Sequence, residues 1–181
     1  FISAAGDSTA ALAFGGYNSG AKDQVESYDG SSWTNGTAIG TARYSSFYGG
    51  SQTAAILAGG NNPNGTNSLV NSEEWNGTAW AEGNDITTAR EGAGAFGIQT
   101  AAIIAAGNTT AVSAITEGYD GTSWSTRPSL ANAREGMGSS GVSTLGLGAG
   151  GNLGPPNAAY NGTEEWTGDV ATETASAIDF D

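Results

Sequence analysis

The segment ESYDGSSW, Glu26–Trp33, decides the fold because related versions of it return along the chain. Its counterparts are EEWNGTAW at Glu73–Trp80 and EGYDGTSW at Glu117–Trp124. Each copy has an acidic residue, an aromatic residue, an Asp or Asn followed by Gly, and then a Trp. Asp-Gly and Asn-Gly favour hairpin turns because Gly accepts the positive φ that these turns require. We therefore predict that each copy forms the outer hairpin of a repeated β unit.

Two further markers advance along the chain in step with this hairpin segment. The run TAALAFGG at Thr9–Gly16 returns as TAAILAGG, TAAIIAAG and TLGLGAGG, with starts 44, 47 and 44 residues apart. Arg43, Arg90 and Arg134 form a third series, spaced by 47 and 44 residues. We predict one domain over residues 1–181, made of four repeats of approximate bounds 1–43, 44–90, 91–134 and 135–181.

Each repeat has the pattern of four short strands. The first strand follows the Arg, and the second is an apolar run closing in Gly-Gly, as expected for a strand buried on both faces. The third ends at the aromatic residue, and the fourth begins near the Trp. A period near 45 residues with four strands is typical of a β-propeller blade. We predict an all-β propeller of about four blades, which either closes alone or completes a ring or a stack with another chain.

The composition excludes several classes of function. The net charge is −13 with five basic residues, so we expect no nucleic-acid partner. No apolar run is long enough to span a membrane, so we expect no membrane insertion. The chain has no His and no Cys, which excludes Ser-His-Asp and Cys-His catalysis and zinc hydrolysis. We therefore expect a protein that is not an enzyme and has neither a cofactor nor a metal site.

The repeat resembles the kelch repeat. The shared landmarks are a Gly-Gly closing the second strand, an acid and an aromatic residue before Asp, a Trp, and a later Arg. The first repeat carries them as Gly15, Gly16, Glu26, Tyr28, Asp29, Trp33 and Arg43. Two departures are Asp-Gly or Asn-Gly in place of the usual Asp-Pro, and small, polar strands. In repeat style the chain is also similar to the kelch-like structural proteins of marine bacteriophages that infect cyanobacteria and SAR11 bacteria. This resemblance implies a location on a virion or an extracellular surface.

The repeated aromatic and charged residues have two interpretations each. The aromatic residues either form a platform for sugar stacking or pack between blades, and their common register favours packing. The arginines either clamp a ligand carboxylate, as in sialidases, or pair with the repeated acids, and the parallel series favour pairing. We predict an inter-blade role for Glu26, Tyr28, Trp33, Arg43, Glu73, Trp75, Trp80, Arg90, Glu117, Tyr119, Trp124, Arg134, Glu164 and Trp166.

Other motifs favour structure over chemistry. The sequence matches GxGxxG three times, but no helix is expected after any match, so we expect no dinucleotide site. The Asn-x-Ser/Thr sequences are typical of turns. Nothing in the acidic pairs Glu73/Glu74 and Glu164/Glu165 marks a glycosidase or a Ca²⁺ site.

The loops that follow Gly-Gly vary in length and are the expected recognition elements, since loops on a rigid scaffold commonly carry binding. We expect partners among glycans and other virion or surface proteins, in a phage tail, fibre or capsid appendage, with a homo-oligomer or larger assembly adding avidity. The alternatives are a purely architectural self-assembling subunit, a sialidase-like hydrolase, and an intracellular kelch adaptor. The candidate ligand-binding residues are Tyr17, Asn18, Asn61, Asn62, Asn64, Asn67, Asn108 and Tyr160.

Overall fold

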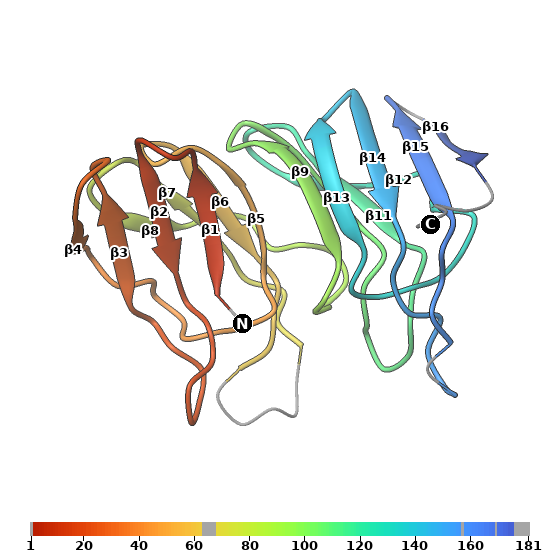
Figure 1. Cartoon of the computed structure of the whole chain (residues 1–181), viewed down its shortest axis with the longest axis horizontal. Coiled ribbons are helices and arrows are strands. Elements are labelled where there is room, and N and C mark those ends of the chain that lie inside the picture. The colour runs from red at the N-terminus through yellow and green to blue at the C-terminus, as the bar shows by residue number, and fades with distance from the viewer. Residues whose placement is uncertain (1, 63–67, 157, 169, 176–181) are drawn as a thin grey trace.

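The chain folds into four small antiparallel sheets arranged as a four-bladed β-propeller (Figure 1). The computed structural model describes residues 2–62, 68–156, 158–168 and 170–175, the last segment as backbone. The described residues contain sixteen strands and no helix. The all-β, four-bladed prediction is confirmed. Within the same residues there is accordingly no helical segment of the length and hydropathy needed to cross a membrane.

Each blade is a meander in which consecutive strands are neighbours and the first strand is innermost. Blade 1 contains β1 (Ser3–Gly6), β2 (Ala11–Phe14), β3 (Val25–Tyr28) and β4 (Trp33–Asn35). Blade 2 contains β5 (Phe47–Gly50), β6 (Ala55–Ala58), β7 (Ser72–Trp75) and β8 (Trp80–Glu82). Blade 3 contains β9 (Gly94–Ile98), β10 (Ala101–Ala105), β11 (Thr116–Tyr119) and β12 (Trp124–Arg127). Blade 4 contains β13 (Gly138–Val142), β14 (Leu145–Ala149), β15 (Thr163–Thr167) and β16 (Val170–Ala175).

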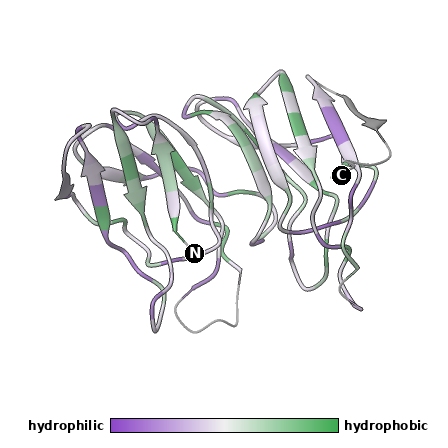
Figure 2. Cartoon of the chain, viewed as in Figure 1, coloured by the Kyte–Doolittle hydropathy of each residue, from purple (hydrophilic) through white to green (hydrophobic). Residues whose placement is uncertain are grey.

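The second strand is almost entirely buried in blades 1 to 3, and in blade 3 the third strand, β11, is buried throughout as well. All four residues of β6 are buried, and so are all residues of β2 and β10 after the first. Strand β14 differs, because its burial alternates between buried and exposed or half-buried positions. Figure 2 shows hydrophobic residues along β2 and β14 and hydrophilic ones on β3 and β15. The side chains of the apolar strand are therefore largely buried in blades 1 to 3, whereas in blade 4 one face of this strand is exposed.

Adjacent blades pack through one hydrophobic cluster each. Successive side chains of a strand point to opposite faces of the sheet, so each blade has a forward face toward the next blade and a backward face toward the preceding one. Between blades 1 and 2, Leu12 and Phe14 on the forward face meet Leu57 and Trp75 on the backward face. The equivalent clusters join blade 2 to blade 3 and blade 3 to blade 4.

Among the described residues, the blades form an arc whose end strands, β1 and β13, do not pack on each other as adjacent inner strands do. The inner strands pack in the order β1 on β5, β5 on β9 and β9 on β13, whereas β13 does not pack on β1 in this way. Figure 1 shows the four inner strands following one another across the view in the same order. The backward face of blade 1 and the forward face of blade 4 are therefore the two ends of the arc.

The residue after each second strand turns the chain into the next loop with a left-handed backbone. Its φ is 64° at Gly15, 58° at Gly59, 65° at Ala106 and 64° at Gly150. A Cβ at Gly59 would lie 2.5 Å from the Phe47 ring and 2.8 Å from the Arg90 carbonyl oxygen. At Gly150 the nearest atom would be 3.5 Å away. The same turn is therefore tight between blades 2 and 3 and open at the end of the arc.

Two alanine substitutions test this difference. Both put an L-residue in a left-handed conformation, which costs about 1 kcal/mol. We expect Gly150→Ala to lower the free energy of unfolding by about that amount, and Gly59→Ala by about 3 kcal/mol because overpacking is added to the strain. Urea unfolding followed by tryptophan fluorescence measures both. Equal losses for the two variants would contradict the packing described around Gly59.

Candidate functional site

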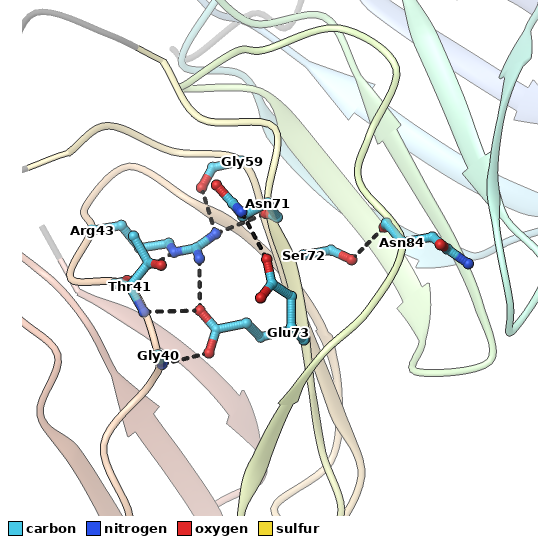
Figure 3. A network of polar contacts seen from close by, with 9 residues as sticks. Gly40, Thr41, Arg43, Gly59, Asn71, Ser72, Glu73 and Asn84 are labelled. Atoms are coloured by element: carbon cyan, nitrogen blue, oxygen red, sulfur yellow. Dashed lines mark hydrogen bonds and ion pairs between the residues drawn. The ribbon is translucent and has the colours of Figure 1, made fainter.

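A buried ion pair fixes the connection between blades 1 and 2 onto blade 2 (Figure 3). The Nη2 of Arg43 lies 2.6 Å from an Oε of Glu73, and the other Nη donates to two backbone carbonyl oxygens, one of them that of Asn71. The same carboxylate accepts the backbone N–H groups of Gly40 at 2.6 Å and Thr41 at 3.2 Å. Because Glu73 is on β7 and the donors are on the connection, the carboxylate holds the incoming chain against its own blade.

The same arrangement recurs at the next two connections. Arg90 pairs with Glu117, whose carboxylate also accepts the N–H groups of Thr87 and Thr88. Arg134 pairs with Glu164 at 3.0 Å, and Ala131 donates its N–H to that carboxylate. The three arginine side chains are fully buried, and their glutamate partners are at most 5% exposed. We call these three units the arginine–glutamate clamps.

Burial of the clamps decides what their arginines can bind. Burial lowers the pKa of Arg43 and of Arg90, and the charges of Glu73 and Glu117 oppose that change. A buried guanidinium that already holds a carboxylate has no exposed face left for a ligand. In this structure the three arginines are therefore not accessible to a substrate carboxylate of the kind that sialidases bind.

In the third clamp, Arg134 is also contacted by a tyrosine that does not belong to the repeated positions. Two nitrogens of Arg134 make no hydrogen bond, although the ion pair is present. The guanidinium lies over the ring of Tyr160, 4.8 Å from its centroid, and Asn132 donates to the Tyr160 hydroxyl at 2.9 Å. Tyr160 was a candidate ligand residue, but it is half-buried and stabilises Arg134 by a cation–π contact.

Two of the candidate asparagines also have structural roles. Asn61 is only 5% exposed, and its amide donates to Glu91 at 2.9 Å. Asn108 is half-buried and donates to Glu135 at 2.9 Å. In this structure the amides of Asn61 and Asn108 are therefore bound to acids of the chain and are not displayed as free ligand donors, so a ligand-binding role for them stays a prediction. Their amides face the acids that follow Arg90 and Arg134, an arrangement that the repeat spacing alone does not indicate.

Blade 1 replaces this amide–acid pair with two tyrosines. Tyr17 occupies the position of Asn61, and Tyr44 that of Glu91. The Tyr17 and Tyr44 ring centroids are 4.9 Å apart in an edge-to-face arrangement, and Tyr17 is 51% exposed. The pKa of Tyr44 is raised by burial and by the nearby Glu91. Of the described aromatic residues in the loops after the second strands, Tyr17 is the most exposed, and the half-buried Tyr44 supports it from the connection to blade 2.

The other loop candidates flank this pair or fall outside the described residues. Asn18, next to Tyr17, is exposed. Asn62 is half-buried and has an interaction partner. Asn64 and Asn67 lie outside the described residues. Of the candidate ligand residues that the structure describes, Tyr17 and Asn18 are therefore the two that are exposed, and Tyr44 packs beside Tyr17.

Blade 1 also departs from the expected inter-blade packing. Trp75, Trp124 and Trp166 lie in the clusters between blades, and Trp80 packs against the first of these clusters. Trp33 is 50% exposed and the neighbouring Glu26 is exposed, while Tyr28, also on the backward face, is half-buried. The inter-blade prediction for Glu26, Tyr28 and Trp33 does not hold within the single chain, because no blade covers the backward face of blade 1.

A further polar contact joins blades 2 and 3. The hydroxyl of Tyr119 donates to the carboxylate of Glu74 on the forward face of blade 2. Burial, and then this bond to Glu74, raise the pKa of Tyr119. Sequence reasoning missed the contact, because Glu74 belongs to a pair of adjacent acids of which only Glu73 is in the repeat register.

The described part of the chain bears on the metal and GxGxxG motifs considered from the sequence. The described residues contain no group of three or more His, Cys, Asp or Glu side chains able to hold a metal ion. The GxGxxG segments Gly92–Gly97 and Gly136–Gly141 lead into or form inner strands β9 and β13, and no helix follows them in this part of the chain.

No protein-family model matches the chain, and a search of curated proteins found no match either. The β-propeller assignment therefore rests on the structure itself.

The clamps predict a large difference between two equivalent acids. Glu117 is buried with Arg90, whereas Glu26, at the same repeat position, is exposed. We expect Glu117→Gln to lower the free energy of unfolding by about 3–5 kcal/mol, because Arg90 is left buried with an uncompensated charge. Urea unfolding at low protein concentration measures this loss. Glu26→Gln is the matched control and should leave the midpoint unchanged. Similar midpoints for both variants would contradict a stabilising role for the clamp.

The Tyr119–Glu74 contact predicts a loss of stability in alkali. Because the folded-state pKa of Tyr119 is raised, its contribution is fully present below the unfolded-state pKa of about 10 and is lost as pH rises above it. We expect Tyr119→Phe to be less stable than the wild type at pH 8 and to lose less stability between pH 9.5 and 11. Urea midpoints over this range measure both slopes. Parallel slopes would show that Tyr119 does not carry the alkaline sensitivity.

Proposed function

We propose that the protein is a non-enzymatic, kelch-like structural and binding propeller of a virion or an extracellular surface. In this role it would belong to a phage tail, fibre or capsid appendage that presents loops for recognition. The proposal rests on one observation: the exposed Tyr17, in contact with the half-buried Tyr44, lies on a scaffold whose clamp arginines are buried in internal ion pairs. An exposed tyrosine ring next in sequence to an exposed asparagine is suited to a neutral, hydroxyl-rich ligand.

The charge of the chain supports a glycan over an anionic polymer. With a net charge of −13 and the described arginine–acid pairs buried, the surface repels polyanions. A glycan presents apolar C–H faces and hydroxyl groups, which tyrosine rings and an asparagine amide complement. A single site of this size binds weakly, so multiple copies on a particle would supply avidity.

An architectural subunit is the second candidate, and a specific observation favours it. The forward face of blade 4 exposes Leu145 at 60% and Leu147 at 47%. Exposed apolar side chains in a row on a sheet face are typical of an assembly surface. In this role the blade faces would carry the function, and the tyrosine pair would have no ligand.

A glycan array separates the two candidates. The wild-type protein, displayed in multivalent form, is compared with Tyr17→Ala and with Leu153→Ala, a loop residue of blade 4 that is 38% exposed. Binding that Tyr17→Ala lowers about tenfold, equivalent to about 1.4 kcal/mol, and that Leu153→Ala preserves would support recognition at the tyrosine pair. Absence of glycan and surface-protein binding, or binding insensitive to Tyr17→Ala, would leave the architectural role as the better account.

A further inference from the structure

The two ends of the arc are faces of the kind that pack together inside the chain. The backward end face is the outer side of blade 1 and includes Tyr28 and the half-exposed Trp33. The forward end face is the outer side of blade 4 and includes Leu145, Leu147 and Glu165, all exposed. At each internal interface a forward face covers a backward face. The chain therefore has one unused copy of each.

The blades alternate between two sequence types at the end of the third strand. This alternation indicates which internal interface the two end faces resemble. Blades 1 and 3 have a Tyr before the Asp-Gly turn, at Tyr28 and Tyr119. Blades 2 and 4 have a Glu-Trp pair instead, beginning at Glu74 and Glu165. A forward face of the second type meets a backward face of the first type once within the chain, between blades 2 and 3. Contact between the two end faces would be a second interface of this type.

The polar contact of the internal interface has both its partners at the ends. Between blades 2 and 3, the Tyr119 hydroxyl donates to Glu74. Each strand register places Glu165 where Glu74 lies and Tyr28 where Tyr119 lies: Glu74 is opposite Ile56 and Glu165 opposite Leu147, while Tyr28 is opposite Ala11 and Tyr119 opposite Ala102. Tyr28 is therefore positioned to donate to a Glu165 on a facing blade.

The apolar parts of the two ends correspond in the same way. Between blades 2 and 3, Ile56 on the forward face shares a cluster with Ile104 and Trp124 on the backward face. The equivalent of Ile56 is Leu147, and the equivalent of Trp124 is Trp33. Leu147 and Trp33 are exposed here, whereas their counterparts are buried. Covering both would remove the exposed apolar surface at the two ends of the arc.

We propose that the forward end face of one chain docks on the backward end face of a second copy of this chain. In the contact, Tyr28 donates to Glu165 of the second copy, and Trp33 covers its Leu147. Because each copy supplies one face of each kind, two copies related by a two-fold axis make two such contacts and close a ring of eight blades. This inference does not depend on ligand binding at Tyr17.

The proposed contact lacks the clamp of the internal interfaces. Glu26 occupies the position of Glu73, Glu117 and Glu164, but no arginine of the described residues pairs with it. An acid that loses water without gaining an arginine weakens the contact. We therefore expect reversible association that dissociates on dilution, in contrast to the permanent packing within a chain.

Light scattering of the purified chain tests the proposal directly. The expected mass at high concentration is twice the 18.0 kDa of the single chain. Leu147→Asp and Trp33→Asp should each reduce it to that of the monomer, and Leu153→Asp is the control for an acid at an exposed loop position. A wild-type monomer at all concentrations would overturn the proposal. The two end faces would then be uncovered, in contact with each other, or the binding surface for a blade of another protein. A dimer that both variants leave intact would overturn it as well.

Mixing the two variants distinguishes head-to-tail docking from other modes of dimerisation. Leu147→Asp retains a normal backward end face, and Trp33→Asp retains a normal forward end face. A mixture should therefore form a 1:1 complex through one intact contact, although each variant alone is monomeric. Failure of the mixture to associate would overturn the head-to-tail arrangement. Circular dichroism tests whether the two variants are folded. If either is unfolded, Tyr28→Phe and Glu165→Gln take the place of the Asp variants, and each is expected to weaken the dimer several-fold.

Discussion

The structure depends on the burial of three arginine–glutamate pairs where the chain passes from one blade to the next. Each carboxylate receives an arginine and at least one backbone N–H from the incoming connection, so one side chain satisfies several buried polar groups together. A buried ion pair is costly to desolvate, and hydrogen bonds offset that cost, as they do at every guanidinium nitrogen of Arg43 and Arg90 but not at two nitrogens of Arg134. The need for these hydrogen bonds makes the geometry of each connection specific. Because the three arginines are bound to glutamates, they are not available to bind an anion.

The same constraint separates the ends of the arc from its interior. Where a clamp is present, the tryptophans beside it lie in or against a hydrophobic cluster, as at Trp75 and Trp124. Where the clamp is missing, at Glu26, the equivalent Trp33 is half exposed. The loops show a parallel difference, since Asn61 is tied to Glu91 while Tyr17 and Tyr44 stack at the surface. Blade 1 therefore carries both the exposed loop residue Tyr17 and a blade face with the half-exposed Trp33.

The sequence predicted the elements of the fold better than their surroundings. Repeat spacing located the hairpins at Asp29 and Asp120, where each carboxylate accepts N–H groups of its own turn. Repeat spacing also showed that the arginine and glutamate series advance in step along the chain, which favoured the pairing of arginine with glutamate. It did not indicate that Asn61 is buried against Glu91 or that Trp33 is half exposed, because periodicity gives the face on which a residue lies and says nothing of what covers that face. The cation–π contact between Arg134 and Tyr160 could not be predicted from the repeat, because Tyr160 lies outside the repeat register.

Hydrogen exchange at backbone amides tests the clamp account most directly. Gly40 and Thr87 donate to the buried carboxylates of the clamps, whereas Ser31 and Thr122 donate to exposed Asp carboxylates in hairpin turns. The bonds are of the same chemical type and differ in burial. The account predicts that the Gly40 and Thr87 amides exchange as slowly as amides of the core strands, and that those of Ser31 and Thr122 exchange rapidly. Rapid exchange at all four amides would contradict the claim that the clamps hold the blades together.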